Sequence, residues 1–72
     1  MSFPERLSTL QKERGLEKQD IYKALGLSQT TYWRYELGKR EPTISVLAAL
    51  ADFFNVSVDY LIGRSNNPAR LP

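Results

Sequence analysis

Three polar residues near the middle of the chain have the spacing that places side chains on the same face of a helix. Gln29 and Thr30 are adjacent, and Arg34 follows about one helical turn later, so a helix would place all three on one face. A glutamine amide can pair with N6 and N7 of adenine, and a threonine offers a hydroxyl to several bases and a methyl group to thymine. A guanidinium suits guanine O6 and N7, and it suits phosphate almost as well. These residue types can therefore bind base edges, provided that the surrounding elements present them together on an exposed helix.

Residues suited to other chemistry are missing from the sequence. The 72 residues include no cysteine and no histidine, which removes disulfides, thiolate metal sites and the commonest general base. The sequence also has no glycine-rich phosphate loop and no paired acids beyond those of ordinary helix faces. We therefore expect no catalytic residue, no metal, no cofactor and no small-molecule substrate, and the protein is not expected to be an enzyme.

Composition and hydropathy predict an ordinary globular domain. Apolar residues make up 42% of the chain and charged residues 25%. No apolar run approaches the ~18 residues that span a bilayer, and the first ten residues lack the apolar stretch of a signal peptide. We expect no membrane contact and a cytoplasmic location, associated with the nucleoid in a bacterial host.

Capping residues, glycines and apolar spacing predict five short helices. Ser2 and Glu5 form a capping-box pattern, and Ser28, Thr43 and Ser57 are good caps for later helices. Glycines or Asn55 follow each apolar stretch and mark the helix ends. The expected helices cover residues 4–14, 17–25, 29–37, 44–54 and 58–62. The fold class is all-α, with one domain over residues 1–63 and a flexible C-terminal tail over residues 64–72.

The second and third expected helices are joined by a very short connection. Only Gly26, Leu27 and the capping residue Ser28 separate them. Glycine permits a sharp turn, and the apolar Leu27 can fix the crossing angle of the two helices. This is the geometry of a helix-turn-helix, in which the second helix enters the major groove of DNA. Residues 29–37 would then be the recognition helix, with Gln29 and Thr30 projecting from its start.

At this point the sequence resembles the phage repressor and Cro-like helix-turn-helix domains, also called the XRE family. The likeness runs from Arg6 to Gly63 through RLSTLQKERGL, GLSQTTYWRYELGKREP and LAALADFFNVSVDYLIG, and its most specific part is RYE-x-GK-x-x-P at 34–42. The resemblance implies a compact five-helix bundle of the lambda-repressor-like type. It also implies a transcription repressor that binds double-stranded DNA as a homodimer on a palindromic operator.

The resemblance implies that the first two residues of the recognition helix contact base edges. Gln29 and Thr30 occupy these positions here, and the alternative for Gln29 is a plain solvated residue of the first turn. Arg34 would reach bases or phosphate. Trp33 departs from the family, which commonly has a small or polar residue there; its indole either packs on thymine methyls or sugars or folds back on the protein. The expected base-reading residues are Gln29, Thr30, Trp33 and Arg34.

Phosphate contacts are expected around this helix. Lys18 replaces a glutamine that the family often places at the start of helix 2, next to the DNA backbone. Lys39 and Arg40 follow the recognition helix, where they either contact phosphate, which fixes register without reading sequence, or are simply solvated. The expected phosphate-contacting residues are Lys18, Ser28, Thr31, Tyr35, Lys39 and Arg40.

Three residues between these positions are expected to be mainly structural. Tyr32 and Tyr35 match positions where the family keeps core side chains, and the Tyr35 phenol could also reach a phosphate at the rim. Related domains often pair the carboxylate at the position of Glu36 with a basic side chain from helix 1. The matching position holds Gln11 here, so this ion pair is in doubt.

Charge and apolar residues are distributed unevenly. Residues 1–40 contain eight basic and five acidic side chains, whereas residues 41–63 contain three acidic and no basic ones, so a polyanion should approach the first part. The last two helices carry more large apolar groups than a short helix can bury. The expected dimer interface is Val58, Tyr60, Leu61 and Ile62, and the alternative is an ordinary apolar edge.

Two further functions remain open on the sequence alone. The domain could be a protein-interaction module that kept the fold without DNA binding, which the modest net charge of +2 and the unusual Trp33 would fit. It could also be a DNA-binding antitoxin that takes a partner through its last helix or tail.

Overall fold

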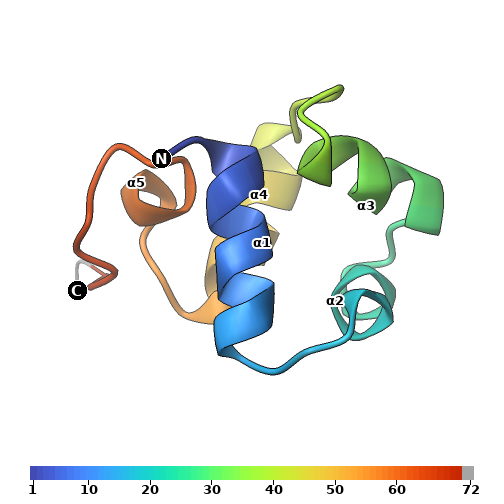
Figure 1. Cartoon of the computed structure of the whole chain (residues 1–72), viewed down its shortest axis with the longest axis horizontal. Coiled ribbons are helices and arrows are strands. Elements are labelled where there is room, and N and C mark those ends of the chain that lie inside the picture. Colours follow the sequence, from blue (N-terminus) through green and yellow to red (C-terminus); the bar gives the residue numbers. More distant parts are fainter. Residues whose placement is uncertain (71–72) are drawn as a thin grey trace.

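A computed structural model describes residues 1–70 of the chain, and this part is all helical. Its elements are α1 (Phe3–Glu13), α2 (Lys18–Ala24), α3 (Gln29–Glu36), α4 (Ile44–Phe54) and α5 (Val58–Leu61). The prediction of an all-α, five-helix fold is confirmed, and each helix boundary lies within one residue of the expected one. α1 runs through the middle of the domain, with α2 and α3 on one side and α5 on the other (Figure 1). α1 contacts both α3 and α5, α2 contacts α3, and α4 contacts α5.

Side-chain caps are found at the beginning of all five helices, and four of them involve residues that the sequence predicted as caps. The Ser2 hydroxyl donates to Oε1 of Glu5 over 2.9 Å, and this hydrogen bond lowers the pKa of the Glu5 carboxyl. The hydroxyl oxygens of Ser28, Thr43 and Ser57 each accept a hydrogen bond from the backbone N–H three residues later. These are the caps that the sequence predicted for α1, α3, α4 and α5.

Each of the five helices is followed by a residue in the left-handed backbone conformation, and four of these residues are glycines. Asn55 closes α4 with φ 56° and ψ 48°, a conformation that asparagine tolerates better than most residues. Gly63 follows α5 with φ +84°, and a Cβ atom built there would lie 1.5 Å from the carbonyl oxygen of Met1. The beginning of the chain therefore packs directly on the glycine that ends α5.

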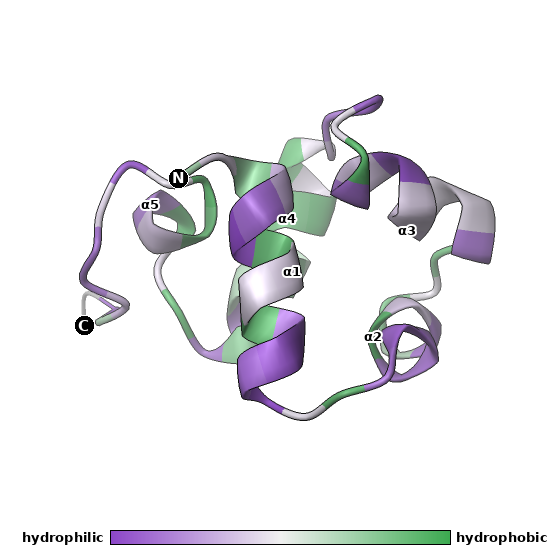
Figure 2. Cartoon of the chain, viewed as in Figure 1, coloured by the Kyte–Doolittle hydropathy of each residue, from purple (hydrophilic) through white to green (hydrophobic). Residues whose placement is uncertain are grey.

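The core is built from the inner faces of all five helices. Figure 2 shows α4 as largely hydrophobic and α2 as mostly hydrophilic. The fully buried apolar side chains come from α1, α2, α3, α4, the α4–α5 connection and α5, and they are Leu7, Leu10, Ile21, Tyr32, Tyr35, Leu50, Ala51, Phe54, Val56 and Leu61. Both tyrosines in this set belong to α3, so the core anchors that helix from one side.

One charged side chain is buried with this core. Arg6 is 5% exposed, its guanidinium carbon lies 3.8 Å from the centre of the Tyr60 ring, and its Nη2 donates to the carbonyl oxygen of Ser65. The ring supplies a cation–π contact to a guanidinium that has little access to water. Arg6 thus connects α1 to α5 and to the segment that follows it.

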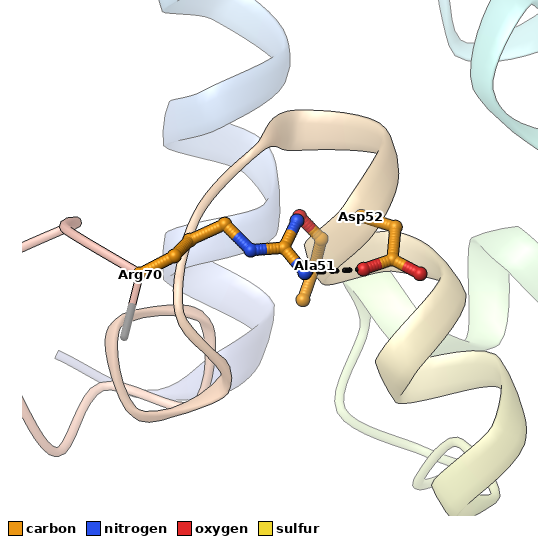
Figure 3. Close-up of polar contacts among 3 residues, drawn as sticks. All are labelled: Ala51, Asp52 and Arg70. Carbon is orange, nitrogen blue, oxygen red and sulfur yellow. Dashed lines mark hydrogen bonds and ion pairs between the residues drawn. The ribbon is translucent and has the colours of Figure 1, made fainter. Parts of the chain in front are cut away.

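Residues 64–70 lie against the domain at several points. The backbone N–H of Ser57 donates to the carbonyl oxygen of Pro68 over 3.0 Å. The guanidinium of Arg70 pairs with the Asp52 carboxylate and donates to the carbonyl oxygen of Ala51, both on α4 (Figure 3). The flexibility expected of residues 64–72 remains a prediction, and Leu71 and Pro72 lie outside the described residues.

Membrane-spanning helices and clusters of metal-ligating side chains each have requirements that residues 1–70 do not meet. None of the helices there is long and apolar enough to cross a membrane. The same residues contain no cluster of three or more potential metal-ligating His, Cys, Asp or Glu side chains.

Candidate nucleic-acid interface

The start of α3 is organised by Ser28. Its Oγ accepts a hydrogen bond from the backbone N–H of Thr31 over 3.1 Å and donates to Oγ1 of Thr31 over 2.8 Å. Gln29 and Thr30 lie within the turn that these contacts close, and both side chains are exposed. The two hydroxyls predicted to contact phosphate therefore also serve as the cap that fixes the first turn of the helix.

One face of α3 is open to solvent. Gln29, Thr30, Trp33 and Arg34 are all exposed, and they recur at the spacing of a single helix face. Trp33 is 55% exposed, so its indole does not fold back into the core. The structure brings the four predicted base-reading side chains together on one surface.

The opposite face of α3 is held by aromatic contacts. The Tyr32 ring packs edge to face on the Tyr22 ring of α2, with 6.2 Å between the ring centres. The Tyr35 ring packs in the same way on the Phe3 ring of α1, with 6.3 Å between the ring centres. Such pairs stabilise packing beyond the area they bury. Tyr32 and Tyr35 thus fix how far α3 stands out from α1 and α2, and the prediction that both belong to the core is confirmed.

Two consequences follow for these tyrosines. Tyr35 is 2% exposed and its ring packs against Phe3, so any contact with phosphate is limited to the phenol oxygen and remains a prediction. The Tyr32 hydroxyl is buried, and no group in residues 1–70 forms a hydrogen bond with it. Burial raises the pKa of the Tyr32 phenol above its ordinary value of 10.0, and the nearby Glu36 carboxylate raises it further.

A groove of about 600 Å³ lies between α2 and α3 beside the exposed face. Its rim carries Lys18 and Gln19 from α2 and Gln29, Thr30 and Trp33 from α3. Gln19 was not predicted as a site residue. Its position could have indicated this role, because Gln19 directly follows Lys18 at the beginning of the helix that packs on the recognition helix. Its side-chain amide can both donate and accept hydrogen bonds.

Lys18 and Glu36 form an ion pair at the same groove. Nζ of Lys18 lies 3.2 Å from Oε1 of Glu36. Gln11 of α1 does not take part, because its amide donates to the carbonyl oxygen of Leu16 over 3.0 Å. The carboxylate of α3 is therefore paired with α2 and not with α1, and the Lys18 side chain is 56% exposed.

Lys39 and Arg40 lie in the connection between α3 and α4. Both are exposed, and within residues 1–70 neither they nor Arg34 has a carboxylate within 4 Å. The backbone N–H of Lys39 donates to the carbonyl oxygen of Arg34, so this connection starts in a defined position at the end of α3. Three cations that form no ion pair with residues 1–70 thus lie along and directly beyond the open face.

The predicted dimer residues of α5 are not equivalent in the structure. Val58 is 40% exposed, and Tyr60 and Ile62 are partly buried. Leu61 is fully buried, so its assignment to the dimer surface is wrong: the four-residue helix turns this side chain into the core against α1 and α4. Only three of the four residues can contribute to a surface that another molecule could touch.

Known proteins share both the sequence pattern and the helix arrangement of this chain. The family model described as "Helix-turn-helix" matches residues 9–61, which include all of α2, α3, α4 and α5. A solved structure described as a transcriptional regulator from Listeria innocua superposes with a TM-score of 0.81 at 39% sequence identity, covering 86% of this chain and 58% of that one. The match therefore extends over the whole arrangement of helices and not only over the motif.

Curated relatives agree with this match. The HTH-type transcriptional regulator AnsR of Bacillus subtilis is 37% identical over 68 residues, which are 94% of this chain and 59% of the relative. The cryptic phage CTXphi transcriptional repressor RstR of Vibrio cholerae is 34% identical over 64 residues, covering 89% of this chain and 57% of the relative. The chain thus spans a little over half the length of the curated relatives it matches.

Proposed function

This chain belongs to the helix-turn-helix family of transcriptional regulators, and from that premise we propose that it is a sequence-specific repressor. It binds duplex DNA as a homodimer on a palindromic operator, with α3 in the major groove. The chemistry is binding alone: the protein occupies an operator and changes nothing covalently.

The observation that carries this proposal is the two-sided character of α3. Tyr32 and Tyr35 hold one side in the core, while Gln29, Thr30 and Arg34 extend from the other side. An α-helix fits the major groove, where each base pair presents its own pattern of donors and acceptors. A rigidly anchored helix with an amide, a hydroxyl and a guanidinium on its open face can read that pattern.

Trp33 adds a large apolar group to this otherwise polar surface. Its indole is large, exposed and placed between Thr30 and Arg34 on the same face. Apolar groups in the major groove contact the thymine methyl, so Trp33 favours operators with thymine opposite this part of the helix. Arg34 and Gln29 supply hydrogen bonds to purines on either side.

Cations and hydroxyls around α3 hold the DNA backbone. Ser28 and Thr31 lie at its start, Lys18 at the rim of the α2–α3 groove, and Lys39 and Arg40 beyond its end. Contacts of this kind set the register of the protein on the duplex and make affinity depend on salt. The acidic residues Asp52 and Asp59 line a separate hollow at α4 and α5, so they do not oppose the phosphates.

The dimer would form through the surface that contains Val58, Tyr60 and Ile62. A two-fold symmetric pair reads two half-sites in successive major grooves, which places the recognition helices ~34 Å apart. Val58→Asp should shift the protein toward the monomer in sedimentation analysis and weaken binding to a two-half-site duplex. An unchanged sedimentation coefficient in Val58→Asp would place the dimer contact elsewhere.

Selection from a random duplex pool tests the function directly. Sequences retained by the protein should converge on a palindrome, and their affinity should exceed that for random duplex by ~1,000-fold or more. If no duplex is retained even at low salt, DNA binding is ruled out. The exposed Trp33 would then support the second candidate, a protein-interaction module that uses the same face of α3.

A further inference from the structure

The ion pair between Lys18 and Glu36 joins two very different environments. The Glu36 side chain is 9% exposed, whereas that of Lys18 is 56% exposed. Lys18 is the first residue of α2, and Glu36 is the last residue of α3. A single contact of 3.2 Å therefore joins an exposed lysine at the start of α2 to a largely buried carboxylate at the end of the recognition helix.

Glu36 has little else to balance its charge. Within the described part of the chain, Lys18 is the one cation within 4 Å of the carboxylate, and Oε1 is buried without a hydrogen bond of good geometry. Gln11 turns its amide to Leu16, and the Tyr32 hydroxyl is buried without a partner. If Lys18 moved away, a buried carboxylate would lose its counter-charge, which is costly.

Lys18 is therefore not a freely moving surface lysine. Its ammonium has three N–H donors, of which one can face Glu36 while the others remain on the exposed side. The side chain lines the α2–α3 groove together with Gln29 and Trp33. The position at which Lys18 can meet a phosphate is thus fixed relative to the base-reading side chains.

We propose that Glu36 is a positioning residue for DNA recognition, which acts by holding Lys18 where a backbone phosphate lies only when α3 is fully seated in its groove. This inference rests on the proposed function and adds a role for a residue that touches no DNA. A lysine fixed in this way contributes to the specific complex, whose register is unique, and little to non-specific complexes, which lack that register. The ion pair therefore increases the ratio of operator affinity to random-duplex affinity more than it increases the affinity for DNA in general.

Glu36→Gln is the variant that tests this role. It keeps the size of the side chain, removes the charge and frees Lys18. We expect affinity for the selected duplex to fall about fivefold to tenfold. Affinity for random duplex should stay the same or rise, and its salt dependence should steepen by about one phosphate contact as Lys18 becomes free to adapt. An unchanged ratio of selected to random affinity would overturn the proposal.

Glu13→Gln is a matched control for the change in net charge. Glu13 is an exposed residue at the end of α1, and within residues 1–70 no cation lies within 4 Å of its carboxylate. This variant should raise affinity for both duplexes by the same small factor and leave their ratio unchanged. If Glu13→Gln lowers the ratio as much as Glu36→Gln does, general charge explains the effect and the proposal fails.

A double-mutant cycle separates positioning from a purely structural role. Lys18→Met should lower the ratio as much as Glu36→Gln does, and the double variant should lower it no further, because Glu36 acts through Lys18. The double variant also leaves no unpaired buried charge, so it keeps the test valid if Lys18→Met alone unfolds. Additive effects on the ratio would show that Glu36 acts independently and would overturn the proposal.

The proposal and the proposed function fail in different ways. A wild-type protein that retains no duplex contradicts DNA binding itself. A wild-type protein that selects an operator, with Glu36→Gln as selective as wild type, contradicts only the positioning role. Lys18→Arg, which keeps a cation in reach of Glu36, should restore most of the selectivity that Lys18→Met loses.

Discussion

The guanidinium of Arg14 donates from Nη2 to the carbonyl oxygen of Phe54 over 2.7 Å. Arg14 is the residue at which α1 ends, and Phe54 is the last residue of α4. The last carbonyl groups of a helix have no partner within the helix and carry partial negative charge. One cation thus caps α4 from the end of α1 and ties together two helices that are distant in the sequence.

Arg14→Gln should lower the free energy of unfolding by about 1–2 kcal/mol, because it removes a charge-assisted hydrogen bond to a helix end. Urea unfolding followed by circular dichroism measures this change. Lys12→Gln is the control: it removes a nearby exposed cation that has no carboxylate within 4 Å in residues 1–70. Equal losses in the two variants would mean that the contact with Phe54 contributes nothing specific.

Gly63 should tolerate a side chain less well than Gly26. Both have positive φ, so alanine costs about 1–2 kcal/mol at either position. At Gly63 the new Cβ would also meet the Met1 carbonyl oxygen, whereas at Gly26 nothing lies within 4 Å. Thermal unfolding should therefore show a larger drop in Tm for Gly63→Ala than for Gly26→Ala, and the reverse order would contradict the close packing of Met1.

Tyr32→Phe should make the protein more resistant to alkaline conditions. The phenol ionises near pH 10.0 in the unfolded chain, but burial and then the Glu36 charge raise its pKa in the folded protein. Folded Tyr32 therefore keeps its proton where the unfolded chain loses it, and the wild type loses stability as the pH rises above 10. Urea unfolding from pH 7 to 11 should give a stability difference between Tyr32→Phe and wild type that is flat below pH 9 and grows above 10.

At neutral pH the same variant should change stability by less than about 1 kcal/mol, because the Tyr32 hydroxyl has no hydrogen-bond partner to lose. A large loss at pH 7 would show that the hydroxyl does bind a partner in solution. A difference that stays constant up to pH 11 would show that the pKa of Tyr32 is the same in the folded and unfolded states, which would contradict the expected effect of burial.

Gln29→Ala and Arg34→Ala should weaken binding to the selected operator by about 1–3 kcal/mol each, since each removes hydrogen bonds to base edges. Binding to random duplex should change far less in Gln29→Ala, which leaves the charge unaltered. Fluorescence anisotropy with labelled duplexes measures both affinities. If neither variant weakens operator binding, the open face of α3 is not the reading surface.

Lys39→Ala serves as the contrast to those two variants. It removes a cation without a base-reading role, so operator and random duplex should weaken together. The slope of log affinity against log salt should flatten by about one unit, the value expected for one phosphate contact. A loss confined to the operator would instead assign Lys39 to base reading.

The sequence was a good guide to the fold because the decisive signals are local. A serine or threonine cap acts three residues away, and a glycine ends the helix directly before it, so Ser28 and Gly38 bracket α3 without reference to the rest of the chain. The open face of α3 followed from the same spacing. The base-reading set could be predicted because it occupies one short helix.

Contacts between distant segments were harder to predict. The pairing of Glu36 with Lys18 depends on how α2 crosses α3, and the bonds of Arg70 to α4 depend on the path of residues 64–70. Periodicity also cannot orient a helix of four residues, so Leu61 could not be told apart from Val58 before the structure. Tyr35 shows the same difficulty, because its packing on Phe3 of α1 decides how deeply its ring is buried.

The packing of Met1 on Gly63 has a practical consequence. It places the amino end of the chain beside α5, on the opposite side of α1 from α3 (Figure 1). A fluorescent protein or an affinity tag joined ahead of Met1 would be carried at the back of the domain, away from a bound duplex. The linker, however, would have to leave without lifting Met1 from its glycine, so a few flexible residues before the fusion are preferable to a rigid helix.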